Sequence, residues 1–516
     1  MGVACSDAQP ATDLALVDHR PDGSIREVTF GQLSELSNRF ANGLKGLGIE
    51  PGDRVGIVVP QSLETGVAHL GTYKAGAVAM PLSVLFGPEA LRFRLQDSGA
   101  KVVVTAPESL EQVIEACTDL DTRIVVAGDS GAYPSFDRVV GSGRATVDPP
   151  GSGPDTPALL IYTSGTTGSP KGALHGHRVL LGHMPGFELM FDFFGRAGDR
   201  IWTPADWAWI GGLLDVVLPG WLRGRPVLAA PREGFDPQWA VDLMVEHGIT
   251  TAFLPPTSLK LMRRAGVDAS RLELRSCMSG GEPLGTEMLQ WAEAELGVVI
   301  NEIYGQTEAN IVVGNSRTVW EVRPGSMGRP FPGHDVAVIT PDGRPSPVGE
   351  IGEIAVRSPD PVMFLGYWNN PGATAEKFAG EWLRTGDLGV TDEDGYLWFR
   401  ARADDLINSA GYRIGPGEIE DCLLKHAAVA MVAVVGVPDE LRGEAVKAYV
   451  QLAPGAAPSD ALVAELQALV RTRLSAHEYP RHVEFVESLP MTTTGKVRRR
   501  ELRERHQDPG LTPGRT

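Results

Sequence analysis

Short apolar segments alternate with longer amphipathic segments along the first part of the chain. The apolar segments predict strands at 53–59, 101–105, 123–127, 158–162, 251–254 and 298–304. Between them, hydrophobic residues at helical spacing predict helices such as 30–47 and 237–247. Strands and helices that alternate along a chain form parallel sheets covered by helices on both faces. This part of the chain therefore predicts an α/β domain.

The pattern changes near Met327, where short runs of alternating apolar and polar residues begin. These runs predict strands at 335–340, 351–357 and 396–400, with Pro341-Asp342-Gly343 as one of the turns between them. Strands without intervening helices predict a small β-rich lobe attached to the α/β domain.

A second change occurs at 403–405, after which the segments have a compact α+β pattern. They predict, in order, helix 418–426, strand 429–437, strand 445–452 and helix 461–474. The predicted fold class is thus α/β: a large N-terminal domain of parallel sheets flanked by helices plus the β-rich lobe, followed by an α+β C-terminal domain. We place the division between residues 1–402 and 403–516.

Composition narrows the possible functions of the 516 residues. Lys and Arg number 47 and Asp and Glu number 65, so the formal net charge is −18. A chain this acidic is poorly suited to neutralising nucleic-acid phosphates. No apolar run approaches the ~18 residues of a membrane span. The four cysteines are far apart and form no CxxC pair, which is typical of a cytoplasmic protein.

One segment after the predicted strand 158–162 has the composition of an anion-binding loop. It reads Tyr162-Thr163-Ser164-Gly165-Thr166-Thr167-Gly168-Ser169-Pro170-Lys171-Gly172. Small hydroxyl residues and glycines let backbone N–H groups turn toward phosphate, and the lysine adds positive charge. The loop is not a Walker loop, because Pro170 precedes the lysine and a glycine follows it. The alternative interpretation is a flexible linker.

The same segment resembles the phosphate loop of the adenylate-forming superfamily, which comprises acyl-CoA synthetases, adenylation domains and luciferases. Five further motifs follow in the order of that family: Gly281-Glu282-Pro283, Tyr304-Gly305-Gln306-Thr307-Glu308, Thr385-Gly386-Asp387, Arg402-Ala403-Asp404-Asp405-Leu406-Ile407 and Thr494-Gly495-Lys496. The resemblance covers nearly the whole chain and is strongest to the medium-chain acyl-CoA synthetases.

The resemblance implies an enzyme that joins a carboxylic acid to ATP as an acyl adenylate and then transfers the acyl group to CoA. It assigns catalytic roles to Lys496, Thr307 and Glu308, with Glu308 positioning Mg²⁺. It assigns the ATP site to Thr163, Ser164, Gly165, Thr166, Thr167, Gly168, Lys171, Gly281, Glu282, Pro283, Tyr304, Gln306, Thr307, Asp387, Arg402, Arg413 and Lys496. Asp404 is implied as the hinge of a mobile C-terminal domain, since one site must perform two reactions.

The acceptor and acid sites follow from the same resemblance. CoA is expected at Gly411, Tyr412, Arg442, Tyr479, Pro480 and Arg481, because arginine suits phosphate groups. The acyl pocket is expected at Trp207, Ile210, Gly211, Gly280 and Gly305. Acetate-specific relatives have tryptophan where this chain has Gly305, so the small residues predict an acid longer than acetate, short- to medium-chain and possessing an apolar tail.

Other functions stay open at this point. The acid can be aromatic, such as a benzoate. The enzyme can be a stand-alone adenylating enzyme that loads a carrier protein, or the chain can be a non-catalytic nucleotide-binding module. The resemblance also suggests that a lysine acetyltransferase and a deacetylase act on Lys496, because acetylation would remove its charge.

Overall fold

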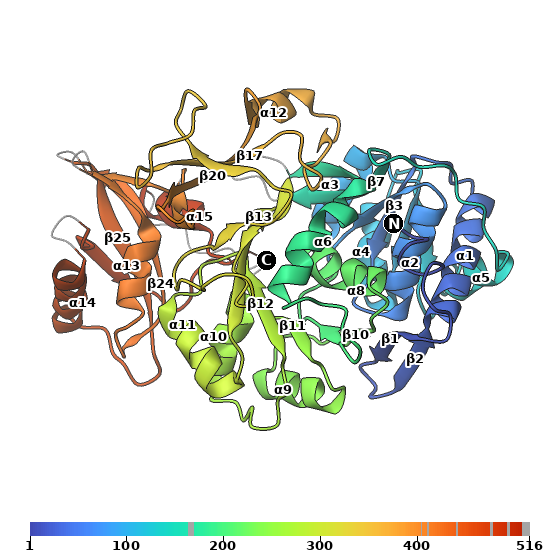
Figure 1. Cartoon of the computed structure of the whole chain (residues 1–516), viewed down its shortest axis with the longest axis horizontal. Helices are drawn as coiled ribbons and strands as arrows, with labels where there is room; N and C mark the ends of the chain where they lie inside the picture. Colours follow the sequence, from blue (N-terminus) through green and yellow to red (C-terminus); the bar gives the residue numbers. More distant parts are fainter. Residues whose placement is uncertain are drawn as a thin grey trace. The chain divides into compact units, whose positions relative to one another are not determined.

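The computed structural model of the chain describes residues 1–163, 170–403, 405–409, 412–439, 442–474, 478–492 and 496–507 (Figure 1). The chain divides into two compact units, one of Met1–Val336 with Val356–Leu383 and one of Ala337–Ala355 with Arg384–Thr516. In this division residues 384–402 belong to the C-terminal unit, whereas the sequence placed the boundary after residue 402.

The larger sheet of the first unit has nine strands in the order β15-β14-β13-β12-β11-β9-β10-β1-β2. The strands from β13 to β1 in this order are all parallel, as the sequence predicted, and antiparallel strands complete both edges. Their bounds are β1 Leu14–His19, β2 Ile25–Thr29, β9 Ile201–Trp202, β10 Val227–Ala229, β11 Thr251–Phe253, β12 Ser276–Gly280, β13 Ile300–Gln306, β14 Ala309–Gly314 and β15 Arg329–Pro330.

A second, seven-stranded sheet has the order β18-β8-β7-β4-β3-β5-β6. Strands β7, β4, β3, β5 and β6 are parallel, whereas β8 runs antiparallel to β7 and to β18. The bounds are β3 Arg54–Val58, β4 Val78–Pro81, β5 Val102–Thr105, β6 Arg123–Val126, β7 Pro157–Thr163, β8 Lys171–Gly176 and β18 Gly366–Tyr367.

Helices lie between the two sheets and on their outer faces. Buried side chains of both sheets meet α1 (Phe30–Gly46), α2 (Leu63–Lys74), α6 (Arg178–Met190) and α8 (Leu218–Leu222) in one core. The outer faces are covered by α3 Pro88–Ser98 and α4 Leu110–Ala116 on the seven-stranded sheet, and by α9 Pro237–Glu246, α10 Pro256–Ala265 and α11 Thr286–Trp291 on the nine-stranded sheet. Helix α5 spans Phe136–Ser142 and packs on α1.

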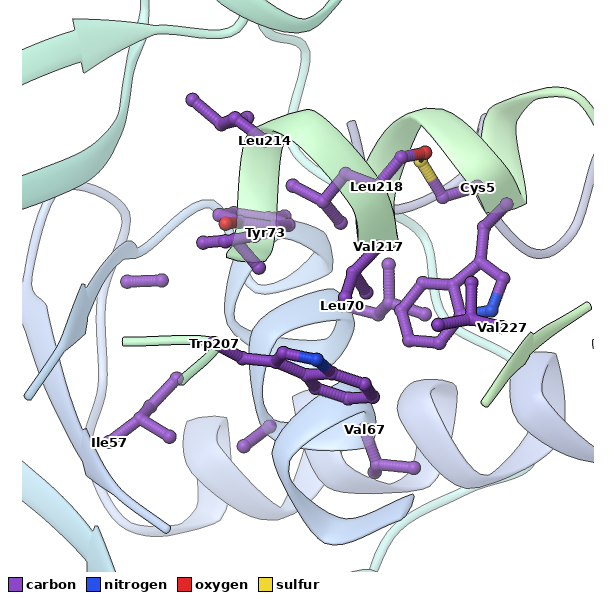
Figure 2. Close-up of a cluster of buried hydrophobic side chains, with 14 of the residues drawn as sticks. Cys5, Ile57, Val67, Leu70, Tyr73, Trp207, Leu214, Val217, Leu218 and Val227 are labelled. Carbon is purple, nitrogen blue, oxygen red and sulfur yellow. Dashed lines mark hydrogen bonds between the residues drawn. The ribbon is translucent and has the colours of Figure 1, made fainter. Parts of the chain in front are cut away.

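The period-two geometry of strands explains why both faces of these sheets are apolar. In β5, Val102 and Val104 face the central core, whereas Val103 faces the outer layer of α3 and α4. Such two-sided burial requires the continuous apolar runs from which the strands were predicted. Figure 2 shows part of the central core, where Trp207 packs among side chains that include Val67 and Val217.

The β-rich lobe is a five-stranded sheet with the order β16-β17-β20-β19, in which β21 pairs with β20. The bounds are β16 Val336–Ile339, β17 Gly352–Arg357, β19 Phe378–Ala379, β20 Trp382–Thr391 and β21 Leu397–Arg402, with the short helix α12 at Pro371–Glu376. The division between the units passes through β16, β17 and β20 along the chain.

The rest of the second unit has the predicted α+β pattern. Its sheet has the order β23-β22-β25-β24, and β26 pairs with β25. The bounds are β22 Ile407–Ser409, β23 Tyr412–Ile414, α13 Pro416–Leu423, β24 Val429–Asp439, β25 Gly443–Leu452, α14 Asp460–Arg473, β26 His482–Phe485 and α15 Arg499–Gln507. Among the described residues, every helix of the chain is too short or too polar to cross a lipid bilayer.

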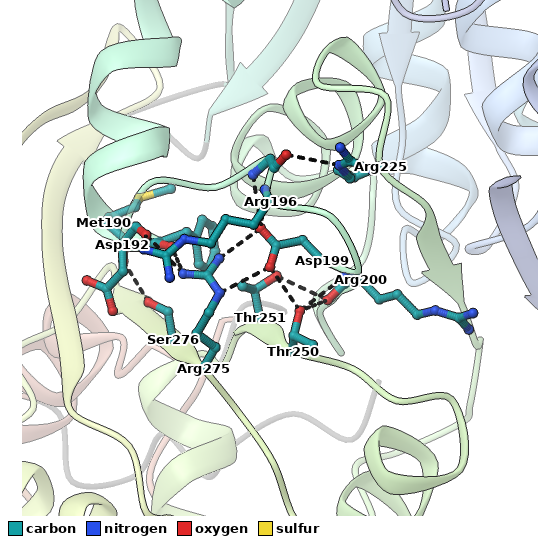
Figure 3. Close-up of polar contacts among 12 residues, drawn as sticks. Met190, Asp192, Arg196, Asp199, Arg200, Arg225, Thr250, Thr251, Arg275 and Ser276 are labelled. Carbon is teal, nitrogen blue, oxygen red and sulfur yellow. Dashed lines mark hydrogen bonds and ion pairs between the residues drawn. The ribbon is translucent and has the colours of Figure 1, made fainter. Parts of the chain in front are cut away.

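A polar network connects the segments at the amino-terminal ends of strands in the nine-stranded sheet (Figure 3). Arg275, directly before β12, donates from Nε and Nη2 to the two carboxylate oxygens of Asp199 at 3.1 and 2.9 Å. Its Nη1 donates to the carbonyl oxygens of Phe191 and Asp192, each at 2.9 Å. This ion pair and these hydrogen bonds therefore stabilise the amino-terminal ends of the strands. The predicted site motifs follow the carboxyl ends of the strands, on the opposite side of the sheet.

Candidate active site

Two predicted motifs lie at neighbouring strand ends of the nine-stranded sheet. Strand β12 ends at Gly280, directly before the Gly281-Glu282-Pro283 motif, and β13 ends at Gln306. The two strands are parallel, with Gly280 opposite Ile303. Because the carboxyl ends of parallel strands lie on the same side of a sheet, the Gly281-Glu282-Pro283 motif and the Thr307-Glu308 motif lie together there, as in other open α/β sheets that bind ligands.

The phosphate loop joins two antiparallel strands. Thr163 ends β7 and pairs with Lys171, the first residue of β8. The loop residues Ser164, Gly165, Thr166, Thr167, Gly168 and Ser169 lie outside the described residues. The lysine Nζ lies over the ring of Tyr367, 5.2 Å from its centroid. The lysine and the start of the loop are therefore held at one corner of the seven-stranded sheet.

Tyr367 also connects this corner to Glu308. Its hydroxyl donates a hydrogen bond to Glu308 Oε1, and the Glu308 carbonyl accepts from the Phe364 N–H at 2.9 Å. Burial and the neighbouring Glu308 carboxylate raise the pKa of Tyr367, so the hydroxyl stays protonated as a donor. Sequence reasoning missed Tyr367 because a two-residue strand has no periodicity of its own.

Glu308 has the chemistry expected of a Mg²⁺ ligand. Its side chain is 6% exposed, and the Tyr367 hydroxyl fixes one oxygen while the carboxylate offers further lone pairs. Mg²⁺ prefers hard oxygen ligands and binds through one or two carboxylates together with substrate phosphates. The residues present therefore fit this ion.

Other predicted nucleotide residues have defined neighbours in the first unit. Gln306 Oε1 accepts a hydrogen bond from Lys377 Nζ at 3.3 Å, and Glu282 forms an ion pair with Lys260 at 3.5 Å. Gly281 has a φ of +95°, a conformation that glycine adopts without strain. Lys377 was not predicted from the sequence, since it belongs to no recognised motif.

In the second unit, Asp387 and Arg402 are cross-strand partners. Asp387 lies on β20 directly opposite Arg402 on β21, and Arg402 Nη1 is 3.5 Å from Asp387 Oδ1. Asp387 is 6% exposed, and its N–H donates to Thr385 Oγ1 at 3.1 Å. The pair thus presents a fixed carboxylate beside a guanidinium, an arrangement suited to hydroxyl and phosphate groups of a nucleotide.

Lys496 lies in a short loop of the second unit. Its N–H donates to Thr492 Oγ1 at 3.0 Å, and its carbonyl accepts from the Thr492 N–H at 2.7 Å. Residues 493–495 of this loop lie outside the described residues. The lysine is exposed, and none of the described residues forms an ion pair with its ammonium group.

Asp404, which the resemblance implies as the hinge, lies outside the described residues, but both of its neighbours are held. The Ala403 N–H donates to the Gly386 carbonyl at 2.8 Å, and Asp405 accepts from Arg503 of α15 at 2.6 Å. Ala403 and Asp405 are therefore both anchored within the second unit.

Two of the predicted CoA residues, Arg442 and Arg481, directly precede strands of the sheet of the second unit. Arg442 directly precedes β25 and Arg481 directly precedes β26. These strands are parallel neighbours, and their register places Arg481 beside Val446, four residues along β25 from Arg442. The Arg481 guanidinium lies 4.8 Å from the ring centroid of Tyr479 and donates to its hydroxyl at 2.8 Å, with Pro480 between them. Gly411 and the side chains of Tyr412 and Arg413 lie outside the described part of the chain.

The glycines predicted for the acyl pocket face packed atoms. A Cβ at Gly280 would lie 2.6 Å from an Ile303 carbon, and one at Gly211 would lie 2.8 Å from the Phe253 ring. A Cβ at Gly305 would contact the backbone of β14 at Asn310 and Ile311. Gly305 therefore allows β13 and β14 to approach closely. This approach is a reason for glycine at position 305 that side-chain volume alone did not indicate. Trp207 lies in the central core, and Ile210 begins helix α7 (Ile210–Gly212).

A buried acid stands beside these glycines. Asp215 is 2% exposed, its Oδ1 accepts from Asn310 Nδ2 at 2.5 Å, and its Oδ2 lies 3.7 Å from the Cβ position of Gly211. Burial raises the pKa of Asp215 well above its ordinary value, although the Asn310 hydrogen bond opposes the shift. The signal that sequence reasoning missed is the single acid within Leu213-Leu214-Asp215-Val216-Val217.

Asp215 predicts a specific pH dependence of stability. The unfolded chain loses the Asp215 proton near pH 4, whereas the folded chain keeps it, so ionisation favours the unfolded state as the pH rises. Asp215→Asn keeps an oxygen for Asn310 and cannot ionise. The free energy of unfolding of this variant relative to the natural chain should rise above pH 4 by up to about 1.4 kcal/mol per pH unit.

Urea unfolding of both chains between pH 4 and pH 8 measures this difference. The neighbouring His183, whose Nε2 lies 3.9 Å from Asp215 Oδ1, has a pKa lowered to about 4 by burial and stays neutral across most of this range. Glu50→Gln at an exposed carboxyl is the control. A difference for Asp215→Asn that is independent of pH would contradict the prediction.

The chain thus combines a parallel α/β unit, which carries the predicted phosphate-loop, Gly-Glu-Pro and Thr-Glu motifs, with a second unit that carries an exposed lysine, as the resemblance to adenylate-forming enzymes implies. Residues 5–368 match the family of AMP-binding enzymes, and residues 418–496 match the AMP-binding enzyme C-terminal domain. The chain therefore belongs to the AMP-binding enzyme family, which confirms the resemblance predicted from the motifs.

Known proteins resemble the chain over most of its length. It is 36% identical over 492 residues to acyl-coenzyme A synthetase ACSM4, mitochondrial, of Homo sapiens, covering 92% of this chain and 84% of the relative. It is 35% identical over 488 residues to acetyl-coenzyme A synthetase of Bacillus subtilis (strain 168), covering 92% and 85%. The solved structure of a Brucella canis acyl-CoA synthetase has a TM-score of 0.76 at 34% identity, covering 99% of this chain and 94% of that chain.

These relatives confirm the predicted class of enzyme, an AMP-forming acid–CoA ligase. Acyl-CoA synthetases use ATP and CoA as substrates. The α/β fold predicted from the sequence, with a large N-terminal part of parallel sheets and a smaller C-terminal part, is confirmed as well.

Proposed function

We propose that this enzyme uses ATP to activate a short- to medium-chain carboxylic acid as an acyl adenylate and then forms the CoA thioester. The observation that carries the proposal is the cluster of Lys171, Tyr367 and Glu308 at the end of the predicted phosphate loop. Tyr367 contacts both charged groups. The Lys171 ammonium is a cation that suits phosphate oxygens, and the buried Glu308 carboxylate suits a hard metal ion. That combination suits a metal-bound polyphosphate.

In the first step, a carboxylate oxygen of the acid attacks the α-phosphorus of ATP. Pyrophosphate leaves with the electron pair of the broken P–O bond. Both reactants are anions, so catalysis depends on cations that hold them in line. In the proposal, Lys171 and the loop hold the β- and γ-phosphates, Asp387 accepts from the ribose hydroxyls, and Lys496 bridges the attacking carboxylate and the α-phosphate.

Tyr304 stacks on adenine in this proposal, and Thr307 and Glu308 face the phosphates. Glu308 would hold Mg²⁺ together with the phosphate oxygens. When bound, the ion neutralises phosphate charge. Arg402 and Arg413 supply further positive charge from the second unit.

In the second step, the CoA thiol releases its proton, the sulfur attacks the acyl carbonyl carbon, and AMP leaves with the electrons of the broken C–O bond. Arg442 and Arg481 would receive the phosphates of CoA, and Gly411 and Tyr412 would follow its pantetheine arm. The positive charge and forked donors of the two arginine side chains, which suit phosphate groups, support this assignment.

The acid is proposed to be short- to medium-chain, with an aromatic acid as the second candidate. The apolar side chains of Phe253 beside Gly211 and of Ile303 beside Gly280 support an apolar tail. One methylene group in an apolar pocket changes kcat/KM by about tenfold or more. We expect kcat/KM for octanoate or hexanoate to exceed that for acetate and benzoate by at least about tenfold, measured by AMP formation with ATP and CoA. Higher kcat/KM for benzoate would favour the aromatic alternative.

The acceptor can be tested separately, because an enzyme that loads a carrier protein also forms the adenylate. Thioester formation with free CoA at a rate comparable to adenylation supports the CoA ligase. Adenylation with CoA inert as the acceptor would favour a separate carrier protein instead.

The hinge predicts that the two half-reactions can be separated. Proline at residue 404 would fix φ near −65° and restrict Ala403, which is already hydrogen-bonded to Gly386. Asp404→Pro should therefore retain adenylation, measured as pyrophosphate release, and lose at least about tenfold in thioester formation from supplied acyl adenylate. Normal overall turnover of this variant would remove Asp404 from the role of hinge, and Asp404→Ala controls for loss of the carboxyl.

Two further proposals concern the cellular setting. The four free, buried cysteines support a reducing compartment such as the cytoplasm. The exposed Lys496 is proposed as a target of an acetyltransferase and a deacetylase, since acetylation removes the charge that the first step needs.

A further inference from the structure

Two histidines and a glutamate from distant parts of the chain converge on the nine-stranded sheet. His19 is the last residue of β1, Glu246 is the last residue of α9, and His247 follows it. His19 Nδ1 lies 2.8 Å from His247 Nε2, and one ligand atom from each of the three residues lies within 4.8 Å of the others. None of the three belongs to the active site described above.

Regular structure fixes both histidines. His19 pairs with Ile25 in the β1–β2 hairpin, and β1 is also paired with β10. The His247 N–H donates to the Leu243 carbonyl at 3.0 Å, and its own carbonyl accepts from Arg200 Nη1 at 3.2 Å. His247 is only 8% exposed. The fold therefore holds the two imidazoles facing each other. Binding of a ligand would cost these side chains little further conformational entropy.

A hydrogen bond between the two imidazole rings does not explain why Glu246 lies beside them. One neutral imidazole can donate to the other, but the Glu246 carboxylate takes no part in that hydrogen bond. Among the residues that the structure describes, none donates a hydrogen bond to its carboxylate or forms an ion pair with it. The exposed Glu246 carboxylate has an oxygen within 4.8 Å of a nitrogen of each imidazole, so the three residues offer three ligand atoms in one place.

The donor set indicates the kind of ion. Two imidazole nitrogens and one carboxylate oxygen are typical of Zn²⁺, which accepts a fourth ligand such as water. Mg²⁺ prefers an all-oxygen shell, so the two imidazoles discriminate against the ion used with ATP. The two charged neighbours of the cluster have opposite signs, so their effects on a bound cation offset each other. Arg200 is close to His247, and Glu27 lies on the face of the hairpin that carries His19.

We propose that His19, Glu246 and His247 bind one Zn²⁺ or a chemically similar divalent transition metal. The ion would link the N-terminal hairpin to the junction of α9 and β11. Its expected effect is to stabilise the large unit, because a ligand that binds only the folded state shifts the unfolding equilibrium.

The test uses the full chain without an affinity tag and without ATP or Mg²⁺. Co²⁺ titration should produce the visible absorption of a low-coordinate imidazole complex at one equivalent, and Zn²⁺ should displace it. Saturating Zn²⁺ should raise Tm by a few degrees. His19→Ala and Glu246→Gln should each weaken Zn²⁺ binding at least about tenfold, measured by calorimetry, and should remove the rise in Tm.

Glu246 is exposed, so Glu246→Gln keeps the fold even if a histidine variant does not. His482→Ala, at an exposed histidine of the second unit, is the matched control and should bind Zn²⁺ as the natural chain does. The proposal is overturned if the natural chain binds no Co²⁺ or Zn²⁺ at one equivalent, or if His19→Ala and Glu246→Gln bind as tightly as the control. Activity with ATP is not part of the readout, so this outcome is independent of the proposed function.

Discussion

Lys496→Ala should lower the rate of adenylation by about 10²–10³ or more. The lysine ammonium is exposed, and its backbone is fixed by two hydrogen bonds with Thr492. In the proposed reaction its charge acts where negative charge accumulates between carboxylate and α-phosphate. Removing one preorganised charge stabiliser from a transition state typically costs this much. Pyrophosphate release with ATP and octanoate measures the effect.

The second half-reaction provides the internal control for Lys496. Thioester formation from a supplied acyl adenylate should be largely retained, because that step does not join two anions. Lys425→Ala, at an exposed lysine of the same unit, should leave both half-reactions unchanged. Lys496→Arg keeps the charge but not its compact shape, and should recover only part of the activity. Equal losses in both half-reactions of Lys496→Ala would contradict a role confined to adenylation.

The buried strands were the most predictable part of the fold. Strands β5 and β6 begin and end within one residue of the predicted segments, because parallel strands covered on both faces need continuous apolar residues. Helix α1 begins at the predicted Phe30, where Thr29 and Gln32 form a capping box. These features are local, so the sequence carries them directly.

Long-range pairings were not predictable from local patterns. Strand β8 was missed, because Lys171–Gly176 has no alternation of apolar and polar residues, and its strand form depends on β7 and β18. Tyr367 and Asp215 were missed for the same reason. Each acquires its meaning from a residue far away in the chain, Glu308 in one case and Asn310 in the other.

The site was predictable as a set of motifs but not as a geometry. Asp387 and Arg402 were expected near each other from family resemblance, and the register of β20 and β21 places them directly opposite. Side-chain volume in the sequence does not reveal that Gly305 lies against the backbone of β14. A tryptophan there would first have to displace that strand, so the substitution would test strand packing as well as pocket size.

Glu308→Gln should also lower adenylation by about 10²–10³, and it should change the response to Mg²⁺. The substitution keeps an oxygen for the Tyr367 hydroxyl and nearly the same volume, but it removes the negative charge. A neutral amide oxygen is a weaker ligand for a hard divalent ion than a carboxylate. The Mg²⁺ concentration that gives half-maximal pyrophosphate release should therefore rise together with the loss in rate.

Tyr367→Phe separates the charge of Glu308 from its orientation. This variant retains the carboxylate and the ring beneath Lys171, and it loses only the hydroxyl that donates to Oε1. Loss of such an orienting partner typically costs about 10- to 100-fold, so Tyr367→Phe should be affected less than Glu308→Gln. If Glu308→Gln stays within about threefold of the natural chain with an unchanged Mg²⁺ response, Glu308 is a structural partner of Tyr367 and not a ligand. If both variants lose rate equally while the Mg²⁺ response is constant, the hydrogen bond accounts for the loss and the charge does not.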